Sequence, residues 1–209
     1  MAITRAFVAV AVLAFALPVG AQPLSGAALV GALQHGGYVL VMRHAHAPEQ
    51  PPSAEQADPA NRTGERQLDT TGRSAALAMG AALRTLHLPI GLVWSSPTYR
   101  ARETAQLTGL PAPKIASELG DSGHSMQAAT SGQATWLTKL ANRPPRPGTD
   151  TVIVTQYPNI KAAFGDEAAN MGDGEALVLQ PAKGTPRLVG RITMEQWPLL
   201  AAGPPPPGH

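Results

Sequence analysis

The chain has 209 residues, of which 44% are hydrophobic and 14% are charged, and its formal net charge is +2. A chain of this length buries a core as one globular domain, and so small a net charge gives no reason to expect a nucleic-acid partner. Cysteine is absent, which excludes disulfides and thiolate metal sites.

Residues 1–21 have the pattern of a signal peptide. Arg5 gives a short basic region, residues 6–17 are apolar, and small residues at Val19 and Ala21 precede a cleavage point before Gln22. The apolar stretch is short for a membrane span, so we expect a periplasmic or secreted mature protein without a membrane partner. The alternative is an uncleaved N-terminal anchor.

Helix and strand patterns alternate along the remainder of the chain. The alternation predicts an α/β fold, a three-layer sandwich with a mainly parallel central sheet and helices on both faces. We expect one domain over 22–202 and a disordered Pro-rich tail at 203–209. The expected helices cover 25–33, 70–86, 97 onward, 127–141, 159–164 and 195–200, and the expected strands cover 38–42, 90–94, 114–116, 151–154, 175–179 and 188–192.

Helix starts are marked by capping residues. Ser25 is expected to cap the first helix, and Asp69 or Thr70 the second. Ser96 is expected to cap the third helix, with Pro97 at its first position.

Polar residues follow three of the apolar strands directly. Arg43 and His44 end the first strand, Arg100 lies just past the second, and Gln156 follows the third. The carboxyl ends of parallel strands form the usual ligand crevice of α/β proteins, so these side chains are expected to converge there. Arginines in the first turn of a helix favour a bound anion, and Arg102 is interpreted as an ordinary surface arginine.

A long irregular loop, residues 45–67, follows the first strand. It has no large apolar residue and contains four prolines, so no regular element is expected in it. A loop of this length in a compact domain is usually a functional lid or is disordered. Arg62 and Arg66 either lie over the site or are solvated loop charges.

Two motifs resemble the histidine phosphatase superfamily, the phosphoglycerate mutase-like phosphatases. One is Arg43-His44 after an apolar strand, and the other is the segment Ser95-Ser96-Pro97-Thr98-Tyr99-Arg100-Ala101-Arg102-Glu103-Thr104-Ala105. The segment 174–178 and the strand after it also resemble the small exported members of that superfamily.

The resemblance implies a phosphomonoester hydrolase that acts through a phosphohistidine on His44. Arg43 and Arg100 would bind the phosphoryl oxygens, since guanidinium groups match phosphate geometry. No metal or other cofactor would be needed, because the arginines supply the positive charge. The expected partner is a phosphorylated small molecule or a phosphopeptide.

Gln156 departs from the family pattern. A second histidine follows the third strand in the family, in a pattern like Thr-His-x-Pro-Asn, and the matching position here is Gln156. Glutamine keeps an N–H donor but lacks the imidazolium charge, and losing one transition-state donor costs on the order of 10²–10³ in rate. Two hypotheses follow: a phosphatase with impaired activity, and a non-catalytic phospho-ligand-binding protein.

The proton donor for the leaving group is expected between the second strand and the next helix. Glu118 and Asp121 are the two candidates there. His44-Ala45-His46 also fits a two-histidine metal pattern, but a metal-dependent barrel hydrolase needs more residues than this chain offers. His46 is therefore interpreted as a pocket or loop residue, and His35 as the end of the first helix.

Overall fold

The computed structural model describes residues 22–121 and 129–203. The expected signal peptide at 1–21 and most of the expected Pro-rich tail lie outside the described residues. Among the described residues, no helix combines the length and the apolar character that crossing a bilayer requires.

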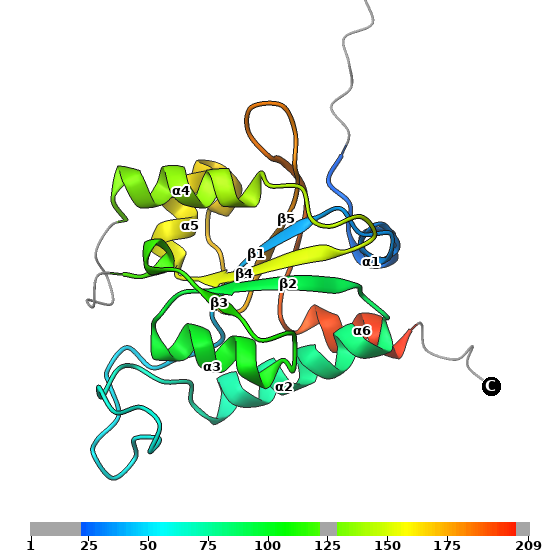
Figure 1. Cartoon of the computed structure of the whole chain (residues 1–209). Helices are drawn as coiled ribbons and strands as arrows, with labels where there is room; N and C mark the ends of the chain where they lie inside the picture. The colour runs from blue at the N-terminus through cyan, green and yellow to red at the C-terminus, as the bar shows by residue number, and fades with distance from the viewer. Residues whose placement is uncertain (1–21, 122–128, 204–209) are drawn as a thin grey trace, which may run out of the picture.

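Six strands form one mixed sheet (Figure 1). The spatial order is β3-β2-β4-β1-β5-β6. The first four strands in this order pair in parallel, and β5 and β6 pair antiparallel, which confirms the mainly parallel sheet. The strands are β1 (Val39–Arg43), β2 (Ile90–Ser95), β3 (Lys114–Ile115), β4 (Asp150–Thr155), β5 (Ala176–Gln180) and β6 (Arg187–Ile192).

Helices cover both faces of the sheet, as expected (Figure 1). Helices α2, α3 and α6 lie on one face, and α4 and α5 on the other. The helices are α1 (Gly26–Gln34), α2 (Thr70–Thr85), α3 (Tyr99–Leu107), α4 (Ser131–Ala141), α5 (Tyr157–Phe164) and α6 (Gln196–Ala202), with the 3₁₀ turns η1 (Ser117–Leu119) and η2 (Gly165–Ala168).

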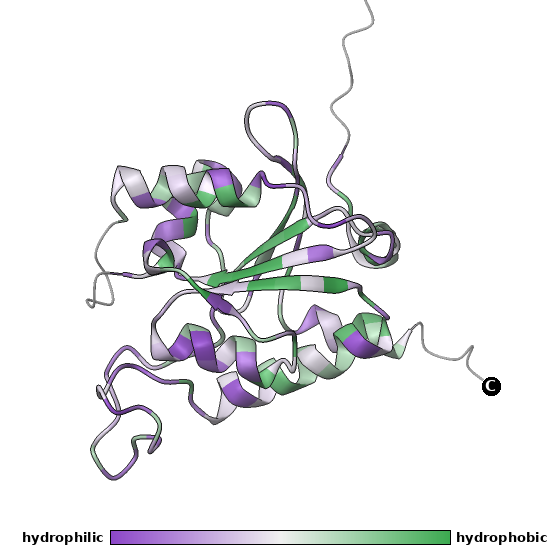
Figure 2. Ribbon diagram, in the orientation of Figure 1, coloured by the Kyte–Doolittle hydropathy of each residue, from purple (hydrophilic) through white to green (hydrophobic). Residues whose placement is uncertain are grey.

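Strand β1 contributes to both halves of the core. Leu40 and Met42 pack into the cluster under α2, α3 and α6, whereas Val39 and Val41 pack into the cluster under α4 and α5. Successive side chains point to opposite faces, so a strand covered on both sides has to be apolar throughout. In Figure 2 the central strands are largely coloured as hydrophobic, with polar residues at strand ends such as Asp150 and Arg43.

The predicted start of the third helix is wrong. Helix α3 begins at Tyr99 with Thr98 as its N-cap, not at Pro97 with Ser96 as cap. Thr98 is extended, with φ −61° and ψ 144°, and the Ser96 hydroxyl accepts the Thr98 N–H instead of capping a later turn. The cap at Asp69 is confirmed, because its carboxylate accepts the Gly72 N–H at 2.8 Å.

Helix α4 is shorter than expected. It begins at Ser131 behind a capping box made by Thr130 and Gln133, whereas the sequence predicts a start near 127. Residues 127 and 128 lie outside the described ranges. The hairpin of the last two strands is confirmed.

Candidate functional site

His44 lies directly after β1, at the carboxyl end of the parallel strands. Its N–H donates to the Thr155 carbonyl of β4 at 3.0 Å, and its own carbonyl accepts the Gly174 N–H at 2.9 Å. The residue is only 3% exposed. Both contacts fix the backbone, so the ring orientation depends on χ angles alone.

Two contacts define the tautomer of the His44 ring. The carbonyl of Ala45 lies 2.7 Å from Nδ1, and a carbonyl only accepts, so Nδ1 carries the hydrogen. Nε2 then has the lone pair, which accepts from Arg100 Nε at 3.0 Å. Burial, followed by the nearby Arg100, lowers the pKa of His44 to about 3. The ring is therefore neutral near pH 7, and its Nε2 lone pair is engaged by Arg100.

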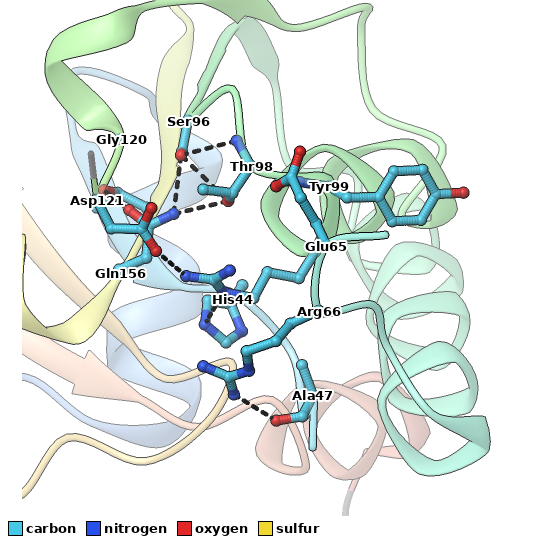
Figure 3. Close-up of polar contacts among 12 residues, drawn as sticks. His44, Ala47, Glu65, Arg66, Ser96, Thr98, Tyr99, Gly120, Asp121 and Gln156 are labelled. Carbon is cyan, nitrogen blue, oxygen red and sulfur yellow. Dashed lines mark hydrogen bonds and ion pairs between the residues drawn. The ribbon is translucent and has the colours of Figure 1, made fainter. Parts of the chain in front are cut away.

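Arg100 links His44 to Asp121. The guanidinium is buried, and its Nη2 donates to Asp121 Oδ2 at 2.5 Å (Figure 3). Thr104 ties the helix to the site loop, since its hydroxyl donates to the Arg100 carbonyl and accepts the Ala45 N–H. The first turn of α3 is thereby attached to the segment that follows β1.

The loop 45–67 brings Arg66, and not Arg62, to this site. Arg66 is 8% exposed, and it donates to the Ala47 and Pro48 carbonyls, each at 2.6 Å. Burial, Arg100 and Arg43 lower the pKa of the Arg66 guanidinium, which places the three cations close together. Arg62 is exposed.

A small cavity lies beside these groups. Its volume is about 180 Å³. The size suits a phosphoryl group and leaves little room for a bulky ligand. Its walls are Pro51, Thr63, Gly64, Glu65, Arg66, Arg100 and Asp121.

Arg43 extends from the end of β1 toward the loop before β5. Its guanidinium pairs with Asp173 at 2.7 Å, donates to the Met171 carbonyl at 3.2 Å and lies 5.9 Å from the Tyr157 ring centroid. About a quarter of the side chain is exposed. Arg43 still acts on His44 electrostatically, because it is among the charges that lower the pKa of that ring.

Gln156 is buried at the carboxyl end of β4, and its amide is fully used within the protein. Nε2 donates to Ser96 Oγ at 2.8 Å and to Thr98 Oγ1 at 2.7 Å (Figure 3). Its oxygen accepts from the Thr155 hydroxyl at 3.1 Å. An amide nitrogen has two hydrogens, so these two contacts account for both donors. The expectation that Gln156 offers a spare N–H to a ligand is therefore not met in this conformation.

The two candidate acids differ in position. Asp121 lines the small cavity and contacts Arg100. Glu118 lies on η1, and its carboxylate accepts from the neighbouring Ser117 hydroxyl in an exposed setting. The structure therefore places Asp121 in the site, whereas Glu118 lies outside it.

Other sequence candidates lie outside the site. His46 contacts Asp69 at 2.9 Å, which fits the interpretation of a loop residue. His35 caps the C-terminus of α1. Arg102 lies over the Tyr99 ring at 5.6 Å, a helix-surface contact. Within 22–121 and 129–203, no group of three or more metal-ligating acidic or histidine side chains comes together.

Sequence reasoning missed Glu65. The N–H of Tyr99, at the start of α3, donates to Glu65 Oε2 at 2.9 Å, so the protein's own carboxylate occupies part of the expected anion position (Figure 3). Only the irregularity of the loop signalled a functional segment, and nothing in the sequence pairs residue 65 with residue 99.

The comparison with family models gives one match. Residues 39–121 match the model described as the histidine phosphatase superfamily (branch 1). This segment includes Arg43, His44, Arg100 and Asp121, whereas Gln156 lies beyond it. No curated protein sequence matches the chain significantly.

Solved structures of phosphatases have the same fold. The protein histidine phosphatase SixA, solved with tungstate, is 19% identical with a TM-score of 0.54, and the match covers 76% of this chain and 98% of SixA. A phosphoserine phosphatase from Entamoeba histolytica, solved with 3-phosphoglyceric acid, is 12% identical with a TM-score of 0.52, covering 75% of this chain and 96% of the neighbour. At these identities the likeness establishes the fold.

Proposed function

We propose that this protein is an exported histidine phosphatase, which hydrolyses phosphomonoesters through a phosphohistidine on His44 with reduced activity because of Gln156. The observation that carries the proposal is the state of the His44 ring. It is neutral, its Nδ1 hydrogen is donated to the Ala45 carbonyl, and its Nε2 accepts from Arg100, which is itself a wall of the small cavity. A buried imidazole used only for packing would not require three arginines around it.

The geometry supports a two-step reaction. His44 Nε2 attacks phosphorus, so an N–P bond forms while the ester P–O bond breaks and the leaving oxygen takes a proton. Water then attacks phosphorus, the N–P bond breaks, and inorganic phosphate leaves. Arg100 and Arg66 stabilise the charge on the phosphoryl oxygens. The leaving oxygen takes the proton carried by the substrate monoanion in the first step, and the Asp121 carboxylate accepts the proton that the attacking water releases in the second.

A second cavity lies on the other side of Pro51 from the small one, and none of Arg66, Arg100 and Asp121 lines it. It has a volume of about 470 Å³ and shares Pro51 with the small cavity. A volume of this size accommodates a group larger than phosphate, such as part of a small metabolite or a peptide segment. The similar SixA and phosphoserine phosphatase folds are in keeping with a phosphorylated small molecule or a phosphopeptide as substrate.

The alternative function is phospho-ligand binding without turnover. The observation that favours it is the contact set of Gln156, whose amide donates to Ser96 and Thr98 and leaves no donor for a transition state. A binding protein would keep the arginines but would lose nothing when His44 is replaced by a residue of similar size.

The test is hydrolysis of p-nitrophenyl phosphate by residues 22–209. We expect slow turnover that disappears in His44→Ala, because the imidazole that would carry the phosphoryl group is then missing. Gln156→His is expected to raise the rate on the order of 10²-fold, the value of one transition-state donor. Turnover that survives in His44→Ala would contradict the proposed nucleophile.

A second measurement separates the two functions. Inorganic phosphate binding is followed by calorimetry in the parent, His44→Asn and Arg100→Ala. Phosphate binding without hydrolysis in the parent and in Gln156→His would favour the binding protein. Absence of both binding and hydrolysis would reject the proposed function in either form.

Exported location stays part of the proposal. It rests on the signal-peptide pattern of residues 1–21, and comparing the N-terminus of the protein recovered from cells with the cut before Gln22 tests it.

A further inference from the structure

Glu103 is a buried carboxylate that the proposed reaction does not use. It lies on α3, one turn after Arg100, and the residue is 7% exposed. One oxygen accepts the Leu68 N–H at 2.9 Å, and the other accepts from Arg73 Nε at 2.6 Å. The carboxylate therefore joins α3 to the end of the site loop and to α2.

A second carboxylate attaches the same loop to α3. Glu65 Oε2 accepts the N–H of Tyr99, which is the first residue of the helix. The two attachment points, at Glu65 and Leu68, lie on either side of Arg66 in the sequence. Helix α3 thus presents Arg100 to the site and fixes the short segment that carries the second buried cation.

Holding Arg66 in place has an electrostatic cost. Its guanidinium is buried and lies near Arg100 and Arg43, and these like charges and the burial all lower its pKa. Within the described part of the chain, its side-chain hydrogen bonds go to two neutral carbonyls, those of Ala47 and Pro48. Asp173 and Glu49 offset part of this lowering, and the contacts of residues 65 and 68 with α3 anchor the segment on both sides of Arg66.

We propose that Glu103 is a positioning residue, which holds the loop against α3 so that Arg66 and Arg100 bind the same oxyanion. The proposal rests on the proposed function for the identity of the ligand. The anchoring itself depends only on the contacts of Glu103 with Leu68 and Arg73. Its removal should therefore weaken anion binding through Arg66 and leave the contribution of Arg100 in place.

The first test is a double-mutant cycle with inorganic phosphate as the ligand. Glu103→Gln is expected to weaken phosphate binding about tenfold in the parent, the loss of one well-placed charge-assisted hydrogen bond. In the Arg66→Ala background the same substitution should cost less than about twofold, because the group it positions is gone. Equal losses in the two backgrounds would show a general structural effect and overturn the proposal.

Two further variants serve as controls, one for the loss of a surface charge and one for the length of the Glu103 side chain. Glu195→Gln removes an exposed carboxylate that makes no cap contact at the start of α6, and should bind phosphate as the parent does. Glu103→Asp keeps the charge but is one methylene shorter, so it cannot reach both Leu68 and Arg73. It should resemble Glu103→Gln, and parent-like phosphate binding in Glu103→Asp would contradict the two-point attachment.

The second test does not depend on phosphate. Trypsin cleaves after arginine, and Arg62 is exposed whereas Arg66 is buried. In Glu103→Gln we expect cleavage after Arg66 to become several times faster relative to cleavage after Arg62, at a temperature where both proteins are folded. An unchanged cleavage pattern would overturn the proposal. If the parent binds no phosphate, the proposed function fails while this test still decides whether Glu103 anchors the loop.

Discussion

The protonation state of His44 follows from its immediate neighbours. Ala45 accepts the Nδ1 hydrogen and Arg100 donates to Nε2, so a second proton on the ring would have to displace a cation. Burial removes the water that would solvate the imidazolium. A histidine used as nucleophile has to be neutral, and here the neutral form is maintained without a carboxylate partner.

The low pKa of His44 predicts a pH dependence of stability. The folded pKa is about 3 and the unfolded value is near 6.5, so the unfolded state binds the extra proton in this interval. The contribution of His44 to stability is therefore complete above pH 6.5 and is lost as the pH falls toward 3. Urea unfolding at pH 7 and pH 5 should show a smaller decrease in His44→Asn than in the parent, and equal decreases would contradict the lowered pKa.

The sequence predicts the principal site residues but not their partners. His44 stands directly after a buried strand, and Arg100 lies in the motif that follows the second strand. Both positions are visible in the sequence, which is why both residues are found. The hydroxyls of Ser96 and Thr98 meet the amide of Gln156 only because β2 and β4 pair side by side, and sequence spacing does not contain that contact.

At the level of elements, the start of α2 is packed against the segment that follows β1. A Cβ atom at Gly72 would lie 2.1 Å from the carbonyl oxygen of His46, so only glycine allows this approach. The helix cap at Asp69 also accepts from His46. The backbone around residue 46, two positions after His44, is thus shaped by α2.

Gly72→Ala should therefore displace the site segment. Overpacking of this kind costs about 1–3 kcal/mol of stability, and the rate of p-nitrophenyl phosphate hydrolysis should fall with it. Gly31→Ala is the matched control, since Gly31 lies in α1 with no atom near its would-be Cβ, and alanine should stabilise that helix by about 0.5–1 kcal/mol. Denaturation midpoints and hydrolysis rates measure both, and a Gly72→Ala protein with parent-like values would refute the close contact.

Element boundaries were predictable where local chemistry decides them. The cap at Asp69 and the irregular loop after β1 follow from residue type alone. The choice between Arg62 and Arg66 does not, because both are loop arginines in the sequence and only the anchoring of residues 65 and 68 on α3 distinguishes them.

Across the whole molecule, the sheet has a polar group buried at the end opposite the site. Asp150 starts β4, is fully buried, and accepts the N–H of Tyr38 with one oxygen at 2.8 Å. Burial raises the pKa of Asp150 to about 7, and the Tyr38 contact offsets part of that rise. The carboxyl group fastens the start of β4 to the start of β1.

The raised pKa of Asp150 predicts that the protein loses stability as the pH rises. The folded pKa lies above the unfolded value of 3.8, so the stabilising contribution is complete below about pH 4 and is lost as the pH rises through 7. Asp150→Asn removes the titration, and its stability relative to the parent should rise by on the order of 2–4 kcal/mol between pH 4 and pH 8. Urea unfolding at several pH values checks this, and a constant difference would contradict it.

The layered architecture is the feature that the sequence predicts best. Apolar runs that alternate with helical stripes require a sheet covered on both faces, and β1 shows why. The order of the strands and the identity of neighbours across the sheet are not encoded by such patterns, so the pairing of β1 with both β4 and β5 had to come from the structure.

The hydrogen bond from the His44 amide to Thr155 has a consequence for measurement. That amide hydrogen extends a pairing in the middle of the sheet, so its exchange with deuterium should require separation of β1 from β4. The slowest exchange class of the molecule would then include the residue proposed as the nucleophile. A substitution in the site that abolishes turnover while this amide stays protected has left the pairing of β1 with β4 intact, so its effect lies in the side chains of the site.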